Sequence, residues 1–243
     1  MWRTVLIAVV TALAAASLPA STDPPFSRVT VYDGMLAMSL PDDWQEIDAV
    51  HLEDLTMWAA DATSGRLVEI YQHGFRPRNS GPDPLLPAIF VQIRESGRQR
   101  YGSFLHLKPL DEFQNDTNKT FPEGLRPLVM GVAVDNLDFD SSIHCLRLEH
   151  SLDLKFKGRV TVLTAAFLTE RGFVTLRYAD REKRMDEGRL LFNKIVHSVS
   201  LAPEIAYRPQ LSDRWPGFPF FLAAALTAGV LVAYLVHRRH SPS

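Results

Sequence analysis

Cysteine is almost absent from this sequence, because Cys145 is the single one among 243 residues. One thiol cannot form an internal disulfide, so the fold must be held together by packing. A lone thiol is also weak evidence for a nucleophile. We interpret Cys145 as a small residue packed in a strand.

Motifs of known chemistry are missing as well. The chain has no H-E-x-x-H, H-x-x-E-H or C-x-x-C, no G-x-S-x-G and no G-x-G-x-x-G. His144 and His150 would lie on one strand face, but roughly 20 Å apart. The sequence therefore predicts no catalytic residue, no metal site and no cofactor, and we expect no enzyme.

An excess of charge of one sign is also absent. The 26 basic and 28 acidic residues give a formal net charge of −2, and both signs are interspersed. Binding to nucleic acid relies on clustered Lys and Arg. We therefore expect no nucleic-acid partner.

Long uncharged runs, by contrast, are present at both ends. Residues 215–236 hold no charged side chain and stop just before Arg238 and Arg239. About 20 apolar residues in a helix match a bilayer core roughly 30 Å thick. The run predicts a transmembrane helix with a cytoplasmic tail at residues 237–243, because positive charge stays inside. A buried core helix is the alternative.

The N-terminus has the pattern of a secretory signal peptide. Arg3 precedes a short apolar stretch, and small residues follow up to Ala20. Residues 1–20 thus predict export, with an uncleaved signal anchor as the alternative. We expect a single-pass membrane protein whose domain, residues 21–203, lies outside, in a periplasm or extracellular space. Residues 204–214 would be its tether.

Turn signals and alternating patterns predict antiparallel strands between these ends. Asp33-Gly34 predicts a hairpin of residues 28–32 and 35–40, followed by a turn at residues 41–44 with Trp44 in the core. A second hairpin is expected around Thr63-Ser64-Gly65, from residues 55–61 and 66–73. Further strands are expected at residues 104–110, 128–134, 145–156, 159–169 and 173–178.

Two stretches have the periodicity of amphipathic helices. Residues 85–101 place Leu86, Phe90 and Ile93 on one stripe, and residues 187–201 place Leu191 and Ile195 on another. Loops are expected at residues 76–87 and 111–124, and an acidic turn at residues 135–140.

The order of elements resembles the Mog1/PsbP-like family. The resemblance rests on residues 35–47 (MLAMSLPDDWQEI), on the strand pair within 143–169, and on residues 167–201. It implies an α+β fold: an antiparallel sheet of about 6–8 strands with helices packed on its faces, here followed by the transmembrane helix. The family acts mainly by binding or assembling and offers no catalytic motif to carry over.

The preferred function is therefore that of an exported, membrane-anchored binding or assembly module with a protein partner in the cell envelope. One candidate partner-binding surface is a basic patch, although a solvated helix face would give the same pattern; its residues are Arg76, Arg78, Arg94, Arg98 and Arg100. The alternative is an exported, hydrolase-like enzyme with a dispersed active site. A deep pocket with converging polar groups and shifted pKa values would favour the enzyme.

Overall fold

The computed structural model describes the central part of the chain. It covers residues 25–62, 71–79, 86–105, 107, 109–120, 129–155, 158–210 and 213, without the side chains of residues 55, 58–62 and 120. The predicted signal peptide, transmembrane segment and cytoplasmic tail lie outside these residues. Within this described part, no helix is both long and apolar enough to cross a membrane.

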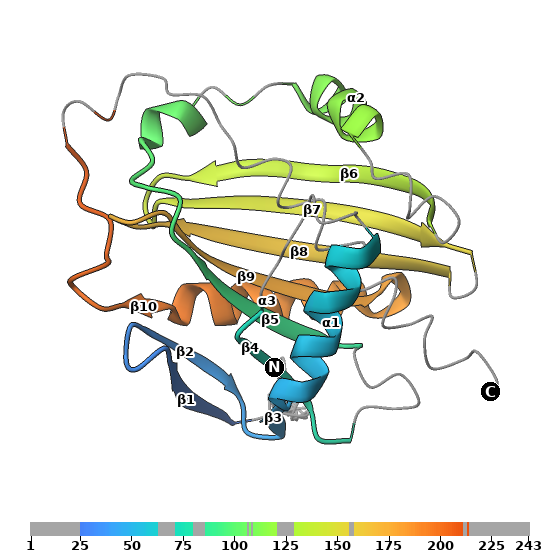
Figure 1. Ribbon diagram of the computed structural model, residues 1–243, viewed down its shortest axis with the longest axis horizontal. Helices are drawn as coiled ribbons and strands as arrows, with labels where there is room; N and C mark the ends of the chain where they lie inside the picture. The colour runs from blue at the N-terminus through green and yellow to red at the C-terminus, as the bar shows by residue number, and fades with distance from the viewer. Residues whose placement is uncertain are drawn as a thin grey trace, which may run out of the picture.

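A seven-stranded antiparallel sheet forms the centre of the fold (Figure 1). Its last three strands in the chain, β7, β8 and β9, are a meander with continuous pairing. From one edge to the other the strands are β3 (Trp44–Glu46), β4 (His73–Pro77), β5 (Ala88–Arg94), β9 (Phe173–Arg181), β8 (Gly158–Leu168), β7 (Cys145–Leu154) and β6 (Val129–Asp140). The predicted class, α+β with six to eight antiparallel strands, is confirmed.

A small three-stranded sheet joins the two ends of the described chain. It consists of β1 (Phe26–Val31), β2 (Leu36–Pro41) and β10 (Ser200–Leu201), in the order β1-β2-β10. The turn between β1 and β2 needs positive φ at Tyr32, Asp33 and Gly34. Glycine accepts this conformation freely, which is why Asp33-Gly34 was a usable turn signal.

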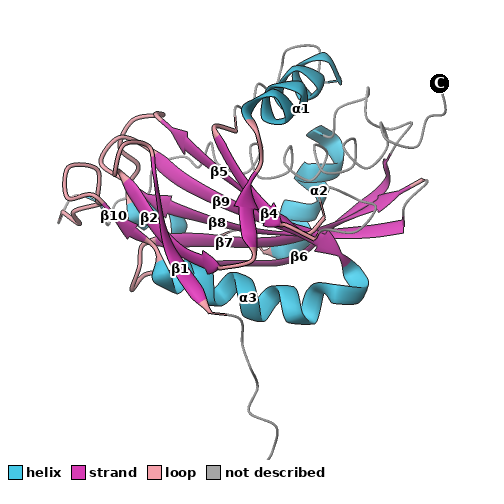
Figure 2. Cartoon of the chain, turned by 90° about the horizontal axis from the view of Figure 1, so that it is seen from below, coloured by secondary structure: helices cyan, strands magenta, loops and turns pink. Residues whose placement is uncertain are grey.

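Helices cover both faces of the large sheet (Figure 2). On one face, α3 (Met185–Ser198) packs with β2 over β8 and β9, and Met38, Ile89 and Leu176 are fully buried between these layers. On the other face lie α1 (Ala49–Ala62) and α2 (Leu110–Thr120). Two 3-10 turns, η1 (Tyr101–Phe104) and η3 (Glu182–Arg184), complete the elements used below.

The first strand of the predicted second hairpin is wrong, because residues 55–61 belong to helix α1. The missed signal is the helix start: Asp48 Oδ1 accepts a hydrogen bond from His51 N at 3.1 Å, as an N-cap does. Leu52 then turns inward and is buried. The proposed turn at residues 63–65 and the following residues up to 70 lie outside the described part.

The helix predicted at residues 85–101 is also wrong, because strand β5 occupies its centre. Ala88, Ile89, Phe90 and Val91 are all buried, with Ile89 and Val91 facing α3 and the other two facing α1. A central strand that is buried on both faces has no alternation of polar and apolar residues. Over so short a run, periodicity does not separate such a strand from a buried helix.

Between β5 and β7 the prediction fails at three more places. In the expected strand at residues 104–110, Phe104 ends η1, Leu110 begins α2, and the described residues between them are not in a strand. The described residues of the expected loop at 111–124, which are residues 111–120, belong to α2. Strand β6 continues through the predicted acidic turn at residues 135–140, where its acidic side chains lie along an edge strand. The closing helix is present, two residues earlier than predicted, and residues 200–201 form β10 instead.

Candidate binding groove and the Arg98 cluster

The five arginines of the predicted basic patch lie in two separate places. Arg76 lies in β4 and Arg78 directly follows it, and Phe75 of β4 pairs with Ile89 near the start of β5. Arg94 ends β5, five residues further along, and Arg98 and Arg100 come after it. At about 3.3 Å per strand residue, the two groups are roughly 15–20 Å apart. The structure thus forms no single patch from these residues, and whether either group binds a partner stays a prediction.

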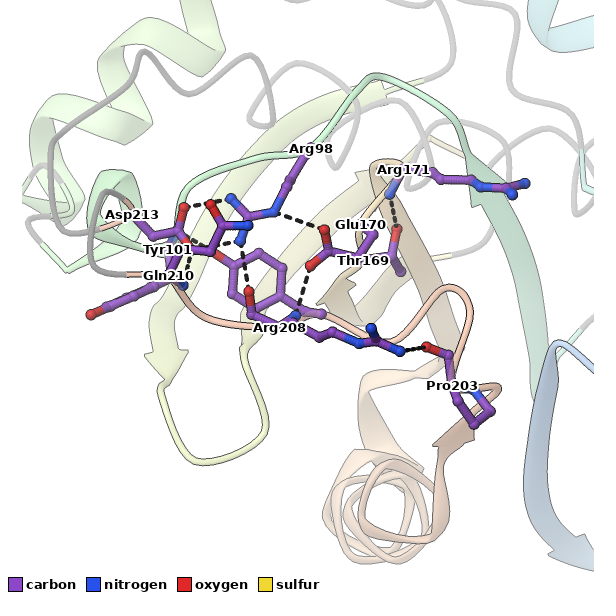
Figure 3. Close-up of polar contacts among 10 residues, drawn as sticks. Arg98, Tyr101, Thr169, Glu170, Arg171, Pro203, Arg208, Gln210 and Asp213 are labelled. Carbon is purple, nitrogen blue, oxygen red and sulfur yellow. Dashed lines mark hydrogen bonds and ion pairs between the residues drawn. The ribbon is translucent and has the colours of Figure 1, made fainter.

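Arg98 lies inside a polar network and not on a solvated helix face (Figure 3). Its guanidinium donates to Asp213 Oδ1 at 2.5 Å and to Oδ2 at 2.6 Å, and to Glu170 Oε2 at 3.0 Å. It also donates to the Arg208 carbonyl at 2.8 Å and stacks over the Tyr207 ring. We call Arg98, Glu170, Tyr207, Arg208 and Asp213 the Arg98 cluster.

Electrostatic attraction between buried or partly buried charges stabilises the Arg98 cluster. The side chain of Asp213 is fully buried, while that of Arg98 is 22% exposed. Hydrogen bonds from Arg98 hold the pKa of the Asp213 carboxyl well below its ordinary value. Removing Arg98 would leave the buried Asp213 carboxylate without its charge partner, which is strongly destabilising.

A groove of about 620 Å³ opens beside α3. Its lining is mostly aromatic, aliphatic and proline, with charged side chains among it. We call it the α3 groove; its lining residues are Phe26, Pro41, Asp43, Trp44, Pro77, Pro87, Tyr178, Asp180, Arg184, Glu187, Gly188, Leu190, Leu191 and Lys194.

The base of the α3 groove is a set of packed aromatic rings. Trp44 stacks on Tyr178 with ring centroids 6.4 Å apart, and Tyr178 packs on Phe192 at 6.1 Å. Gly188 allows helix α3 to lie close to the Tyr178 ring, because a Cβ at position 188 would lie 2.6 Å from Tyr178 Cε1. Trp44 is 8% exposed, in agreement with its predicted place in the core.

The buried polar groups beside the α3 groove satisfy each other. Asp180 accepts hydrogen bonds from the Tyr178 hydroxyl at 3.1 Å, from Arg181 N at 2.7 Å and from Arg184 at 2.5 Å. Burial, and then the Asp180 charge, raise the pKa of Tyr178 above its ordinary value. The phenol therefore stays neutral and acts as a donor.

The rim of the α3 groove presents groups that the fold leaves unused. Leu190 on α3 is 67% exposed. Asp43 and Glu187 are exposed, and neither carboxylate has a hydrogen bond or ion pair within the described part of the chain. An apolar surface with two free carboxylates suits a ligand that is apolar and carries positive charge.

A second, smaller hollow of about 240 Å³ lies between α3 and strands β6 to β8. Its charged side chains are already engaged with each other. Arg189 Nη2 donates to Glu149 at 2.6 Å, and Arg147 donates to Asn193 at 3.2 Å. This hollow has fewer groups to offer a ligand than the α3 groove.

The residues considered for metal or thiol chemistry do not assemble. In the described ranges, no group of three His, Cys, Asp or Glu side chains is placed to hold a metal ion. Cys145 is buried, which raises the pKa of its thiol to about 12. His144 is partly buried ahead of β7, whereas His150 is fully buried within the strand.

Sequence reasoning missed both the α3 groove and the Arg98 cluster. The groove is built from β1, β2, β3, β4, α3 and the strand end at Tyr178, so its residues share no local pattern. Arg98 and Asp213 are 115 positions apart. The three prolines at strand ends, Pro41, Pro77 and Pro87, are the one local hint, since they mark where strands stop and side chains gather.

The chain has likenesses to solved structures. No protein-family profile and no curated protein sequence matches it. It is similar to cyanobacterial PsbP from Synechocystis sp. PCC 6803, with 14% identity and a TM-score of 0.49, over 77% of this chain and 99% of that one.

Two further likenesses are of the same kind. The Ran-binding protein Mog1p of Saccharomyces cerevisiae shares 13% identity at a TM-score of 0.42, over 74% of this chain and 96% of that one. LpqN, involved in cell envelope biogenesis of Mycobacterium tuberculosis, shares 14% identity at a TM-score of 0.36, over 74% and 91%. At these scores no functional conclusion is drawn from them.

Proposed function

We propose that this protein is a non-catalytic binding module that docks an extended, apolar or proline-containing peptide with a basic side chain in the α3 groove. The observation that carries the proposal is the groove itself: packed rings at its base, prolines and exposed Leu190 around them, and two free carboxylates on the rim. A Mog1/PsbP-like fold, which the sequence resemblance implies, would be consistent with a binding or assembly role.

The size and lining of the groove favour a peptide. A volume of about 620 Å³ lies within the range of roughly 300–1,000 Å³ typical of ligand sites. Aromatic-lined grooves recognise proline-containing segments because these are already extended and lose little conformational entropy on binding. Trp44 and the partly exposed Phe26 line the groove with aromatic rings of this kind.

The charges on the rim favour a basic side chain on the partner. Asp180 is neutralised by Arg184, whereas Asp43 and Glu187 have no partner within the described part. Charge complementarity of this kind contributes mainly to specificity and to the rate of association. Lys194 on the same helix would disfavour a second basic group near its own position.

Catalysis is the alternative function, as an exported hydrolase-like enzyme. It would require polar groups that are poised to react. The groove instead has a neutral Tyr178 hydroxyl bound to an Asp180 that already accepts three hydrogen bonds. This arrangement supports binding.

The proposed location follows from the two hydrophobic ends of the sequence. Residues 1–20 direct export and residues 215–236 anchor the protein in a membrane as a single pass, with the domain outside and the tail cytoplasmic. The peptide partner is then a protein of the cell envelope.

The test compares binding of synthetic ten-residue peptides by the full chain and its variants. The peptides combine proline and leucine with one arginine, and each is matched by a version with glutamate in place of arginine. We expect the arginine peptides to bind more tightly. Leu190→Gln, which removes the apolar contact without adding charge, should weaken that binding about tenfold, the size expected for a central contact.

The matched control is Met130→Gln, at an equally exposed apolar residue on β6 (70% exposed). It should leave binding unchanged. Equal binding of arginine and glutamate peptides, or equal effects of the two substitutions, would overturn the proposal. Hydrolysis of an ester or peptide substrate that Tyr178→Phe abolishes would favour the enzyme instead.

A further inference from the structure

The chain after α3 is attached to the domain and is not a loose connection. Ile205 is 4% exposed within the core beneath α3, and its carbonyl accepts a hydrogen bond from Glu170 N at 3.0 Å. Ala206 forms an isolated bridge with Thr169, and Ala202 N donates to Met35 O at 2.9 Å. Most of the segment predicted as a tether thus follows the surface of the domain. The predicted domain boundaries themselves stay predictions.

The Arg98 cluster fixes the last described residue. Besides the two bonds from Arg98, Asp213 Oδ2 accepts from Gln210 N at 2.6 Å, and Asp213 N donates to Gln210 O at 3.0 Å. The Arg208 guanidinium donates in turn to the Pro203 carbonyl at 2.9 Å. These contacts hold Asp213 at a defined point on the domain (Figure 3).

Asp213 is close to the predicted membrane segment in sequence. Residues 215–236 begin two positions after Asp213. Two residues span at most about 7 Å even when fully extended. The face of the domain around the Arg98 cluster must then lie within about one Debye length of the bilayer surface.

This face carries more positive than negative charge. Its arginines are Arg94, Arg98, Arg100, Arg171 and Arg208, and its carboxylates are Glu95, Glu170, Glu204 and Asp213. Three of the four carboxylates are already bound by arginines: Glu95 by Arg171, and Glu170 and Asp213 by Arg98. Arg94 and Arg100 are exposed, and neither guanidinium has a hydrogen bond or ion pair with any described residue.

We infer that the face around the Arg98 cluster rests on anionic lipid headgroups, with Arg94 and Arg100 as its contacts. The inference rests on the proposed membrane segment and is independent of the peptide in the α3 groove. The groove is lined by α3 residues from Glu187 to Lys194, and its centre lies roughly 12 Å along the helix axis from Ser198, where α3 ends ahead of the Arg98 cluster. The domain would stand with its groove directed away from the membrane.

The test measures the distance of two labels from the lipid surface in the full chain. The chain is reconstituted in vesicles of phosphatidylcholine with phosphatidylglycerol, and a dye is attached at Ser96→Cys or at Asn79→Cys. Both positions are exposed, whereas native Cys145 is buried and stays unlabelled. Lipids with a nitroxide on the headgroup quench dyes that lie close to the surface.

We expect the dye at position 96 to be quenched at least twofold more than the dye at position 79. The double substitution Arg94→Glu with Arg100→Glu should reduce this difference, and so should raising the salt concentration. The matched control, Arg28→Glu with Arg78→Glu, changes the net charge equally on exposed residues elsewhere and should have no effect.

The possible outcomes test the orientation of the domain and the membrane anchor independently. Equal quenching of both dyes in a chain that floats with the vesicles would overturn the orientation. The same difference in vesicles of phosphatidylcholine alone would overturn the role of anionic lipid. A chain that does not float with the vesicles would overturn the membrane segment, while leaving the peptide groove unaffected.

Discussion

A single buried histidine makes the stability of this protein depend on pH. His150 is fully buried on β7, and neither ring nitrogen has a hydrogen-bond partner among the described residues. Burial, together with the nearby Arg177 charge, lowers the pKa of His150 to about 3. The ring is therefore neutral in the folded protein well above pH 3. Its unfolded form, with a pKa near 6.5, gains a proton below that pH.

We predict that His150 makes the protein less stable as the pH falls. Between about pH 6.5 and pH 3 the unfolded state binds one proton more than the folded state, so the free energy of unfolding decreases with acidity. From pH 7 to pH 5 the loss is about 2 kcal/mol. Urea unfolding at both pH values should show it in the natural chain and not in His150→Leu. His197→Gln, at an exposed position on α3, should keep the full loss; an unchanged pH dependence in His150→Leu would contradict the prediction.

At the scale of elements, the open edge of the large sheet is covered by a side chain. Within the part of the chain that the structure describes, strand β6 has no neighbouring strand on its outer side. Gln114 of α2 takes that place, because its amide nitrogen donates to Val132 O at 2.9 Å and its oxygen accepts from Val134 N at 2.5 Å. Together with irregular pairing near Gly131 and Asn136, this disfavours pairing with another chain.

We predict that Gln114→Ala destabilises the fold by about 1–3 kcal/mol, because a buried Val134 N–H and the Val132 carbonyl lose their partner. It should also promote aggregation, since the β6 edge becomes available. Unfolding midpoints and light scattering on heating measure the two effects. Asn115→Ala, one position along the same helix and exposed, is the control and should change neither. Identical behaviour of the two variants would mean that the edge is protected by other means.

For the whole molecule, the decisive feature is that both ends of the described chain meet. Strand β10 pairs with β2, and Ile205 completes the core that β2, α3 and the large sheet share. Residues after the last helix are thus part of the cooperative unit. A truncated domain that ends directly after α3 would lack both strand β10 and Ile205.

We predict that Ile205→Ala costs about 2–5 kcal/mol of stability, the range for a buried aliphatic side chain reduced to alanine. Leu190→Ala, at a residue that is 67% exposed, should change stability by less than about 0.5 kcal/mol. Chemical denaturation of the full chain and both variants gives the comparison. A loss at Ile205 as small as that at Leu190 would show that residues 202–210 do not belong to the folded unit.

The sequence by itself determined the elements whose signals are local. The hairpin at Asp33-Gly34, the strands of the β7–β8–β9 meander and the closing helix α3 follow from turn chemistry and from clear periods of 2 and 3.6. The hydrophobic ends are signals of the same kind, and their interpretation as export and membrane segments stays a prediction.

Only the tertiary structure decided the rest. The helix predicted at residues 85–101 is wrong because strand β5 is buried on both faces and has no alternation of polar and apolar residues. The strand predicted at residues 55–61 is wrong because only the Asp48 cap marks the start of α1. The α3 groove and the Arg98 cluster join residues up to 115 positions apart. Such contacts depend on how the layers pack, and a linear pattern records only the neighbours within one element.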